Sequence, residues 1–376
     1  MIDFSKSPKR AGGDSLKWIR YADRNVIPAW IADTEFAAAE PIQRALQERL
    51  QHGVFGYAEP TPALIETVIA YFGRRWHWDI SPDWLVFLPG LGCAIHAVCR
   101  MAEGGDILTP RPIYHAFRKA PALAGARLVD VDMILESGEW KLPMENATVS
   151  EKSKVFQLCN PHNPNGKVFS RDELLAIGEF CLTNNLILCA DEVHADLILD
   201  DDAKHLPIAA LDDNIARCCI TLQSPSKAFN VAGLNFAVAV IPDTALRARF
   251  HASLAGRVIT HLNPFGMAAA IAAWGGDCDE WLVAANAHLR QNRDILSAAV
   301  ANIDGIEMSH LASTCLAWLN VRALYLDDAP AHFEAHGLAM SPGEHFGDAD
   351  YMRLNFGCTA DLLHKMIDIL HTAAAK

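Results

Sequence analysis

The sequence has few basic residues for its length. Its 376 residues include 32 Lys and Arg against 45 Asp and Glu, which gives a formal net charge of −13 at pH 7. Duplex nucleic acid and anionic membranes both select proteins with basic surface patches. The charge balance therefore argues against nucleic acid or membrane partners, but it leaves room for a local pocket that binds a small anion.

The sequence also lacks a long hydrophobic run. A membrane-spanning helix needs about 20 consecutive apolar residues, and the uncharged stretch 258–276 contains His261, Asn263 and Pro264. We expect a buried turn and helix there. The first six residues contain no apolar core of the kind that marks a secretory signal. These features predict a cytoplasmic protein.

Several catalytic and metal-binding motifs are missing. The 10 cysteines form no CxxC pair and show no regular spacing with histidine, so we expect reduced, mostly buried thiols and no metal site. No HExxH, GxSxG or P-loop motif occurs. The turn at 90–92 resembles the start of a dinucleotide-binding fingerprint, but Ile95 occupies its third glycine position. Nicotinamide binding is not expected.

What the sequence does contain is an alternation of short apolar segments and amphipathic helices. Helices are predicted at 93–101 and at 170–183, the second with Ser170 as N-cap and Glu173 completing a capping box. Continuous apolar strands separated by helices predict a mostly parallel sheet covered on both faces, which is an α/β architecture. The seven predicted strands are 84–88, 106–109, 126–131, 154–158, 186–190, 218–222 and 236–241.

The length suits two domains. Beyond the seven strands, a long helix at 281–301 and short strands at 317–321 and 352–356 indicate a second, smaller α/β unit. We predict a large domain at 42–285. We expect the small domain to combine an N-terminal arm, residues 1–41, with residues 286–376.

Polar clusters follow four of the predicted strands. In parallel sheets, ligands bind beyond the carboxyl ends of the strands, so these clusters predict a single site at one edge of the sheet. The clusters lie at 90–92, 160–166, 191–196 and 224–230.

Two residues in these clusters indicate a specific chemistry. Lys227 follows an apolar strand, and a desolvated lysine loses its proton readily and can form a Schiff base. Taken alone, a Ser-x-Ser-Lys segment is more often a solvated loop. Asp191 also follows an apolar strand, and a buried carboxylate costs several kcal/mol unless it is paired. Asp191 is therefore expected to face a cation or a protonated ring nitrogen.

Together these clusters resemble the aspartate-aminotransferase-like, fold type I family of pyridoxal-phosphate enzymes. Seven motifs in the family's order narrow the resemblance to the bacterial cystathionine β-lyases, or C–S lyases, of the MalY/PatB type. The resemblance covers almost the whole chain and implies the aspartate aminotransferase fold and pyridoxal 5′-phosphate as cofactor. The motifs lie at 17–18, 30–33, 54–57, 112–117, 160–164, 191–196 and 227–234.

The resemblance assigns roles around the cofactor. Lys227 would bind it covalently as an aldimine, Asp191 would pair with its ring nitrogen, and Asn163 would hydrogen-bond its ring hydroxyl. Tyr114 would stack on the ring and, with Lys227 and Asp191, would complete the catalytic set. His194 would support the cofactor. The phosphate contacts would come from Gly90, Leu91, Gly92, Ser224 and Ser226, and from Tyr57 of a neighbouring subunit.

The substrate side of the site shows both matches and departures. Arg353 would clamp the substrate's α-carboxylate. Asn235 stands eight residues after Lys227, where many relatives carry a phosphate-binding arginine that the C–S lyase group commonly lacks. Residues 34–36 and His115 differ from the usual motifs, which leaves the substrate open. The other residues expected to bind substrate are Asn163, Trp30, Ile31 and Tyr57.

The resemblance implies a pyridoxal-phosphate C–S β-lyase that cleaves cystathionine or a related cysteine S-conjugate to a thiol, pyruvate and ammonia, through a quinonoid carbanion. An aminotransferase would use the same residues and stays an alternative. A regulatory or interaction protein that keeps the fold is a third, against which the presence of Lys227, Asp191, Asn163 and Arg353 argues. A small amino-acid substrate and a homodimer with interfacial active sites are expected.

Overall fold

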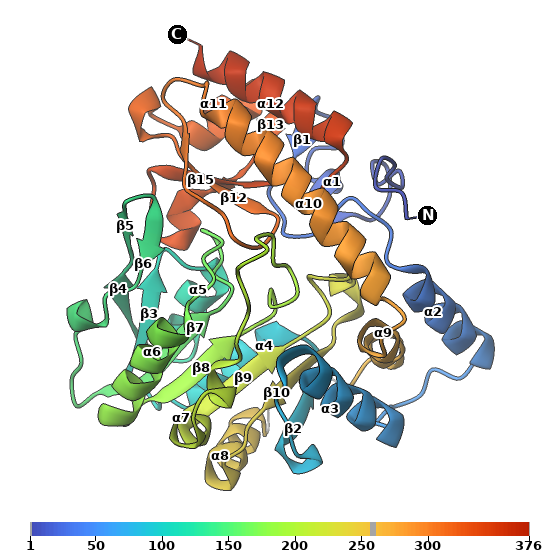
Figure 1. The fold of residues 1–376 in the computed structure, drawn as a ribbon, viewed down its shortest axis with the longest axis vertical. Coiled ribbons are helices and arrows are strands. Elements are labelled where there is room, and N and C mark those ends of the chain that lie inside the picture. Colours follow the sequence, from blue (N-terminus) through green and yellow to red (C-terminus); the bar gives the residue numbers. More distant parts are fainter. Residues whose placement is uncertain (1, 256–260, 376) are drawn as a thin grey trace.

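A central seven-stranded sheet organises the larger part of the protein (Figure 1). The computed structural model describes residues 2–255 and 261–375. Strand β10 runs antiparallel to both of its neighbours, and the other six strands are parallel to one another. The mostly parallel sheet expected from the sequence is confirmed. In spatial order its strands are β2 (Leu85–Leu88), β10 (Ala237–Val240), β9 (Cys219–Gln223), β8 (Ile187–Asp191), β7 (Ser153–Cys159), β3 (Asp106–Arg111) and β4 (Arg127–Asp132).

Helices cover both faces of this sheet. On one face, Val98 of α4, Phe117 of α5 and Phe250 of α8 share a buried cluster with strand residues such as Val155 and Ile220. The opposite face is covered by the remaining large-domain helices, whose buried residues belong to a second cluster. The helices are α4 (Leu91–Arg100), α5 (His115–Leu123) and α8 (Thr244–Leu254), then α2 (Glu40–His52), α3 (Pro62–Trp76), α6 (Arg171–Thr183), α7 (Asp213–Cys218) and α9 (Pro264–Trp274).

The predicted start of α6 is confirmed in detail. The Ser170 hydroxyl accepts a hydrogen bond from the Glu173 amide at 3.3 Å, and the Glu173 carboxylate accepts one from the Ser170 amide at 2.8 Å. This capping box satisfies two amides that the first turn would otherwise leave unpaired. Of the stretch 258–276, residues 258–260 lie outside the described residues, and α9 provides the expected helix.

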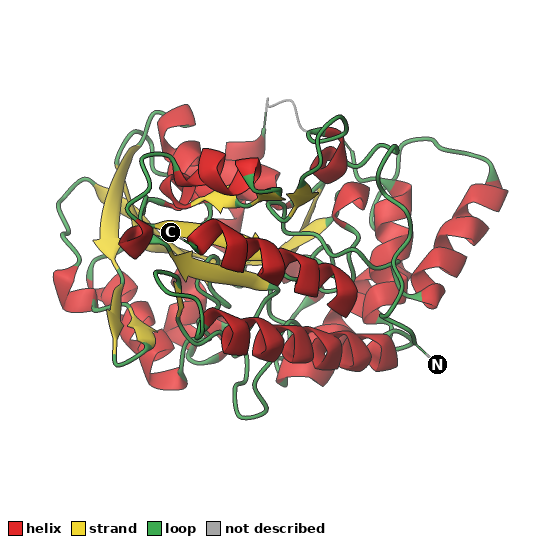
Figure 2. Ribbon diagram, turned by 90° about the horizontal axis from the view of Figure 1, so that it is seen from above, coloured by secondary structure: helices red, strands yellow, loops and turns green. Residues whose placement is uncertain are grey.

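A smaller antiparallel sheet lies beside the large one, with strand order β11-β12-β15-β14 (Figure 2). Strand β1 (Ile27–Pro28) pairs in parallel with β13 (Leu338–Ala339), which attaches the N-terminal segment to the C-terminal part of the chain. Helix α10 (Asp279–Val300) continues through the predicted boundary between residues 285 and 286. The division into domains therefore stays a prediction. The remaining elements are β11 (Glu307–Met308), β12 (Leu316–Asn320), β14 (Ser341–Pro342), β15 (Tyr351–Asn355), α1 (Leu16–Ile19), α11 (Ala329–Ala335), α12 (Ala360–Ala374) and the hairpin β5 (Ile134–Glu136) and β6 (Glu139–Lys141).

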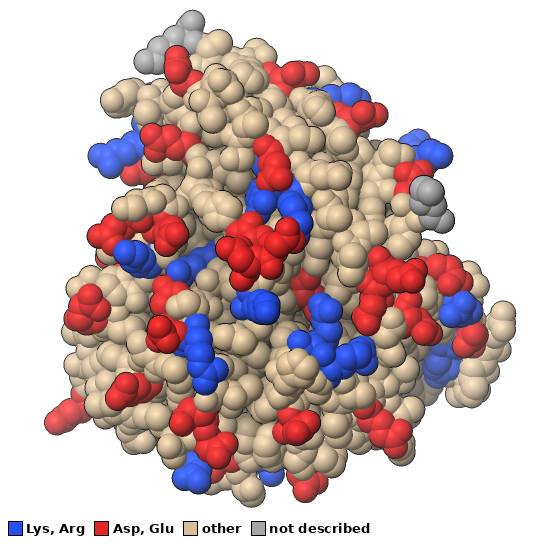
Figure 3. Space-filling model, viewed as in Figure 1, with Lys and Arg blue, Asp and Glu red and all other residues tan. Residues whose placement is uncertain are grey.

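The surface carries charges of both signs. Figure 3 shows acidic and basic side chains interspersed over one face. Among the described residues, no helix is long and apolar enough to cross a membrane, and no group of histidine, cysteine and acidic side chains could hold a metal ion. All 10 cysteines are free, and all except Cys93 and Cys218 are buried.

Candidate active site

The carboxyl ends of the parallel strands bring the predicted site residues to one edge of the large sheet. Asp191 is the last residue of β8, and Lys227 follows β9 within four residues. Asn163 follows β7, and Tyr114 follows β3 just before α5 begins. Figure 1 shows these connections between the large sheet and the smaller one. The structure therefore brings the polar residues of these strand ends to one edge of the sheet, and the site itself stays a prediction.

Lys227 lies in a desolvated position. Its Nζ donates a hydrogen bond to the backbone oxygen of Ala32 at 2.9 Å. Burial lowers the pKa of Lys227, the positive charge of Arg353 lowers it further, and Asp33 and Asp191 oppose the shift. A lysine with a lowered pKa supplies more of the neutral amine, the form that acts as nucleophile or base.

Asp191 is a buried carboxylic acid with an altered acidity. Burial raises its pKa from 3.8 to about 6, against a hydrogen bond that Oδ1 accepts from the Val193 amide at 3.1 Å and against the charge of Lys227. The adjacent Glu192 carboxylate raises the pKa further. Such a group is stabilised as an anion only when a cation or a protonated nitrogen is placed against it.

Arg353 projects from β15 and is almost fully buried. Its Nη1 donates to Asn163 Oδ1 at 2.9 Å and its Nη2 donates to the Trp30 oxygen at 2.9 Å. The guanidinium lies over the Phe346 ring, 4.6 Å from its centroid. Burial lowers the pKa of Arg353 to about 10. Its buried Nε has no hydrogen-bond partner among the described residues, so this donor is among those available to a ligand.

The predicted phosphate end of the site is the N-terminus of α4. Gly90 has a φ of 114°, which a residue with a Cβ rarely adopts, and no side chain caps the helix there. Uncapped amides at a helix N-terminus favour an anion. Asn235 is exposed nearby: a Cβ added to Gly90 would lie 3.8 Å from Asn235 Oδ1. Asn235, the neutral residue expected in place of a phosphate-binding arginine, therefore lies beside the turn at 90–92.

The two serines near this helix differ in their contacts. The Ser224 hydroxyl donates to the Phe236 oxygen at 2.6 Å and accepts from the Ser226 amide at 3.2 Å, so it is engaged within the loop. The Ser226 hydroxyl is half-buried and has no such bond in the described chain. Ser226 is thus the serine with a free hydroxyl.

Three further predicted residues have distinct surroundings. His194 is buried, its Nδ1 has no partner in the described part of the chain, and burial lowers its pKa to about 3, so it is neutral. Tyr114 is half-buried, with its ring 4.4 Å from that of His115. Tyr57 is 92% exposed, and its ring lies 4.8 Å from His261. Within the described chain, no ring contact or hydrogen bond joins Tyr57 to another predicted site residue.

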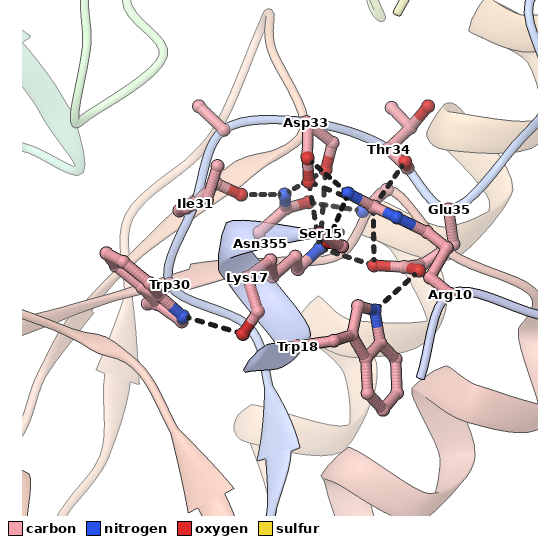
Figure 4. A network of polar contacts seen from close by, with 12 residues as sticks. Arg10, Ser15, Lys17, Trp18, Trp30, Ile31, Asp33, Thr34, Glu35 and Asn355 are labelled. Carbon is pink, nitrogen blue, oxygen red and sulfur yellow. Dashed lines mark hydrogen bonds and ion pairs between the residues drawn. The ribbon is translucent and has the colours of Figure 1, made fainter. Parts of the chain in front are cut away.

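The sequence did not reveal how the N-terminal segment is held against this site. Figure 4 shows two cations converging on the acidic pair Asp33 and Glu35. Lys17 Nζ lies 2.6 Å from Glu35 Oε1, and Arg10 Nη2 lies 2.6 Å from Asp33 Oδ2. Trp18 Nε1 donates to Glu35 Oε2 at 3.1 Å. Lys17 and Glu35 are each 3% exposed, so this ion cluster is largely buried.

Two asparagine side chains hold the segment 30–36 in addition to the ion cluster. Asn355 Nδ2 donates to the oxygens of Ile31 and Asp33, and Asn230 exchanges hydrogen bonds with the backbone of Thr34 at 3.0 Å. The carbonyl groups of Trp30 and Ala32 are then directed at Arg353 and Lys227. The Lys17-Trp18 pair was a motif in the sequence, but only the fold shows what it contacts.

These residues fit a phosphorylated, carbonyl-bearing aromatic cofactor. A buried amine, a buried carboxyl group that needs a cation, a side-chain amide and an uncapped helix N-terminus lie at one edge of one sheet. The unpaired donor of Arg353 and the unpaired ring nitrogen of His194 leave polar atoms that a ligand would satisfy.

Comparison with known proteins gives matches over the full length. Residues 32–370 match the family described as "Aminotransferase class I and II". The chain is 33% identical to the cystathionine β-lyase PatB of Bacillus subtilis (strain 168), over 95% of this chain and 96% of PatB. The crystal structure of OvoB superposes with a TM-score of 0.96 at 40% identity and covers 100% of both chains. Cystalysin from Treponema denticola, whose structure contains pyridoxal 5′-phosphate, superposes with a TM-score of 0.94 at 26% identity over 99% of each chain.

Proposed function

The chain belongs to the class I and II aminotransferase family, and we propose that it is a C–S β-lyase which cleaves cystathionine or a related cysteine S-conjugate to a thiol, pyruvate and ammonia. Its cofactor is pyridoxal 5′-phosphate, as in the family and its solved relatives. The observation that carries the proposal is the match to a cystathionine β-lyase over 95% of the chain.

Arg353 binds the substrate's α-carboxylate in this proposal. The guanidinium is held by the Trp30 oxygen and Asn163, and its Nε is free to donate. Because a planar guanidinium can make two parallel bonds to a carboxylate, it fixes the orientation of the amino acid as well as its position.

Lys227 and Asp191 handle the protons. Pyridoxal phosphate, when bound, delocalises the negative charge that develops at the substrate's Cα. Lys227 Nζ takes the Cα proton, a role suited to an amine whose pKa burial has lowered. Asp191 holds a proton on the cofactor's ring nitrogen, because that contact supplies the positive charge its buried carboxylate needs.

The surrounding residues position these groups. The Ala32 oxygen holds Lys227 Nζ, Tyr114 packs on the cofactor ring, and Asn163 binds the ring hydroxyl. Ser226 and the first amides of α4 bind the phosphate, with Ser224 bracing the loop through Phe236. His194 stays neutral, and its Nδ1, which has no partner in the described residues, is available to support the cofactor.

The proposal includes a cytoplasmic homodimer. Val54, Phe55 and Tyr57 are 63%, 55% and 92% exposed in one segment between α2 and α3, a concentration of apolar surface that favours burial by a second subunit. Tyr57 would reach the partner's phosphate site and the neighbouring substrate from there. The ten free thiols suit a reducing compartment.

Product analysis tests the function. The purified protein, loaded with pyridoxal phosphate, is incubated with cystathionine and a panel of cysteine S-conjugates. Pyruvate and free thiol are then measured, and amino transfer to added keto acids is measured in parallel. Equal yields of pyruvate and thiol support the lyase. Keto-acid-dependent transfer without thiol release would instead identify an aminotransferase, and no turnover of any substrate would favour a non-catalytic role.

A further inference from the structure

Four basic side chains of the described chain lie near Arg353 and make no ion pair. We call Arg20, His115, Lys119 and His345 the distal cluster. Other basic groups near the site, such as Arg10 and Lys17, are paired with acids. Of the four, Arg20, Lys119 and His345 are exposed and His115 is half-buried, and no hydrogen bond or ion pair within the described residues engages any of them.

The two histidines border the site directly. His115 is the first residue of α5, and its ring centroid lies 4.4 Å from that of Tyr114. The imidazoles of His115 and His345 are 6.5 Å apart, and His115 lies 6.4 Å from Phe346, the ring beneath Arg353. His115 therefore lies beside the proposed ring-stacking tyrosine and near the proposed carboxylate clamp, and His345 lies on the far side of His115.

The two permanent cations lie next to the histidines. Lys119 is one helical turn after His115, on the same face of α5. Its charge acts on both imidazoles. The Arg20 guanidinium lies over the Trp30 ring, 4.9 Å from the centroid, and Arg353 donates to the oxygen of that same Trp30. Glu344, the neighbour of His345 in the chain, is exposed like His345, and its negative charge opposes the lowering of the His345 pKa.

We propose that the distal cluster is a subsite for an anionic group, such as a carboxylate, on the part of the S-conjugate that leaves with sulfur. This inference rests on the proposed lyase function and names its substrate class. With the α-carboxylate at Arg353 and the cofactor ring at Tyr114, the remaining substrate atoms would extend past His115, which lies against Tyr114 and Phe346, towards His345.

The chemistry of the cluster suits an anion. Burial lowers the pKa of His115 to about 4, and burial and Lys119 lower that of His345, so both rings are neutral near pH 7 and each can donate one hydrogen bond. Lys119 and Arg20 supply the charge. Imidazole N–H donors that lie close to the positive charges of Lys119 and Arg20 favour a carboxylate over a neutral group of the same size.

A matched pair of substrates tests the subsite. S-(2-carboxyethyl)-L-cysteine and S-(2-carbamoylethyl)-L-cysteine differ by one charge and have nearly the same shape. We expect kcat/KM for the acid to exceed that for the amide by about tenfold, mainly through KM, in line with a charge-assisted hydrogen bond. In the Arg20→Gln/Lys119→Gln variant this ratio should fall towards one.

Two further variants separate charge from packing. His115→Gln keeps a hydrogen-bond donor and should retain more of the preference than His115→Leu. Lys365→Gln removes one positive charge from the exposed face of α12 and should leave the ratio unchanged. A wild-type ratio near one, or a ratio that the Arg20/Lys119 variant does not change, overturns the subsite.

The subsite and the lyase function can fail separately. If neither these conjugates nor cystathionine yields pyruvate, the proposed function is wrong, and the affinity ratio is then read from the change in cofactor absorbance on binding. Equal affinity for acid and amide in that titration overturns the subsite as well. Efficient pyruvate release from both conjugates with equal KM keeps the lyase and removes the subsite.

Discussion

Arg353 Nη1 donates a hydrogen bond to Asn163 Oδ1 at 2.9 Å, although the two residues are 190 positions apart in the chain. Arg353 belongs to the small sheet, and Asn163 belongs to the loop after a strand of the large sheet. In our proposal Asn163 contacts the cofactor and Arg353 contacts the substrate. One hydrogen bond therefore connects the two binding events across the two sheets.

Replacing Arg353 with lysine tests the substrate clamp. An ammonium group can make neither the bidentate contact nor both existing hydrogen bonds, so we expect KM for amino-acid substrates to rise by about tenfold to a hundredfold. Cofactor absorbance should be retained. Arg322→Lys, an exposed residue of the same part of the chain, serves as the control. An unchanged KM would refute the assignment.

Lys227→Ala tests the covalent attachment of the cofactor. The wild-type protein should show a visible absorption band with pyridoxal phosphate that borohydride reduction makes permanent. The variant should lose that band and lose activity by at least about a thousandfold, because nucleophile and base are removed together. Lys204→Ala, a surface lysine, should change neither. A normal band in Lys227→Ala would contradict the whole family-based reading of the site.

Asp191→Asn should stabilise the cofactor-free protein while weakening the enzyme. The raised pKa of Asp191 corresponds to about 3 kcal/mol of stability that is present below pH 3.8 and lost as the pH rises through about 6. At pH 7.5 the cofactor-free variant should therefore unfold at higher urea than wild type, and near pH 4 the two should converge. Loaded with cofactor, the variant should have lower kcat.

Urea unfolding across this pH range provides the measurement. Asp202→Asn, an exposed carboxylate, is the matched control and should follow wild type at every pH. Parallel curves for wild type and Asp191→Asn would show that the carboxylate is not held in a desolvated position.

The buried ion cluster of the N-terminal segment should contribute to stability. Lys17→Met leaves the Glu35 carboxylate, which is 3% exposed, with Arg10 as its remaining cation, so we expect a loss of about 3 kcal/mol in the free energy of unfolding. Arg44→Met breaks an exposed pair with Glu40 and should cost less than about 1 kcal/mol. Equal losses in the two variants would show that the cluster is solvated.

Much of the large sheet could be predicted, because each buried strand is a continuous apolar run bounded by turn residues. The difference at β3 has a clear reason. The predicted strand ended at residue 109, and Pro110 cannot donate to a ladder, but the strand continues to Arg111 because Pro110 and Arg111 pair with Val131 and Asp132 of β4. Local patterns decide the type of an element, and the neighbouring strand decides its length.

The contacts between distant segments could not be predicted. The sequence shows Lys17 and Glu35 as two charges among many, and nothing in their spacing indicates that both are buried against one another. Likewise, His115 appeared only as a departure from a motif, while its position beside His345 depends on how the two sheets pack. Side-chain pairs that join separate elements are properties of the packed chain.

The buried thiols bear on how the protein would tolerate the thiol that our proposal assigns as its product. Burial raises the pKa of Cys315, close to Lys227, to about 11 and that of Cys99 to about 12, so these sulfurs stay protonated and out of reach. Thiol–disulfide exchange requires an accessible thiolate. A lyase that releases thiols could otherwise be capped by mixed disulfides. Among the 10 cysteines only Cys93 and Cys218 are half-exposed, so a thiol released in the proposed reaction would meet few reactive protein sulfurs.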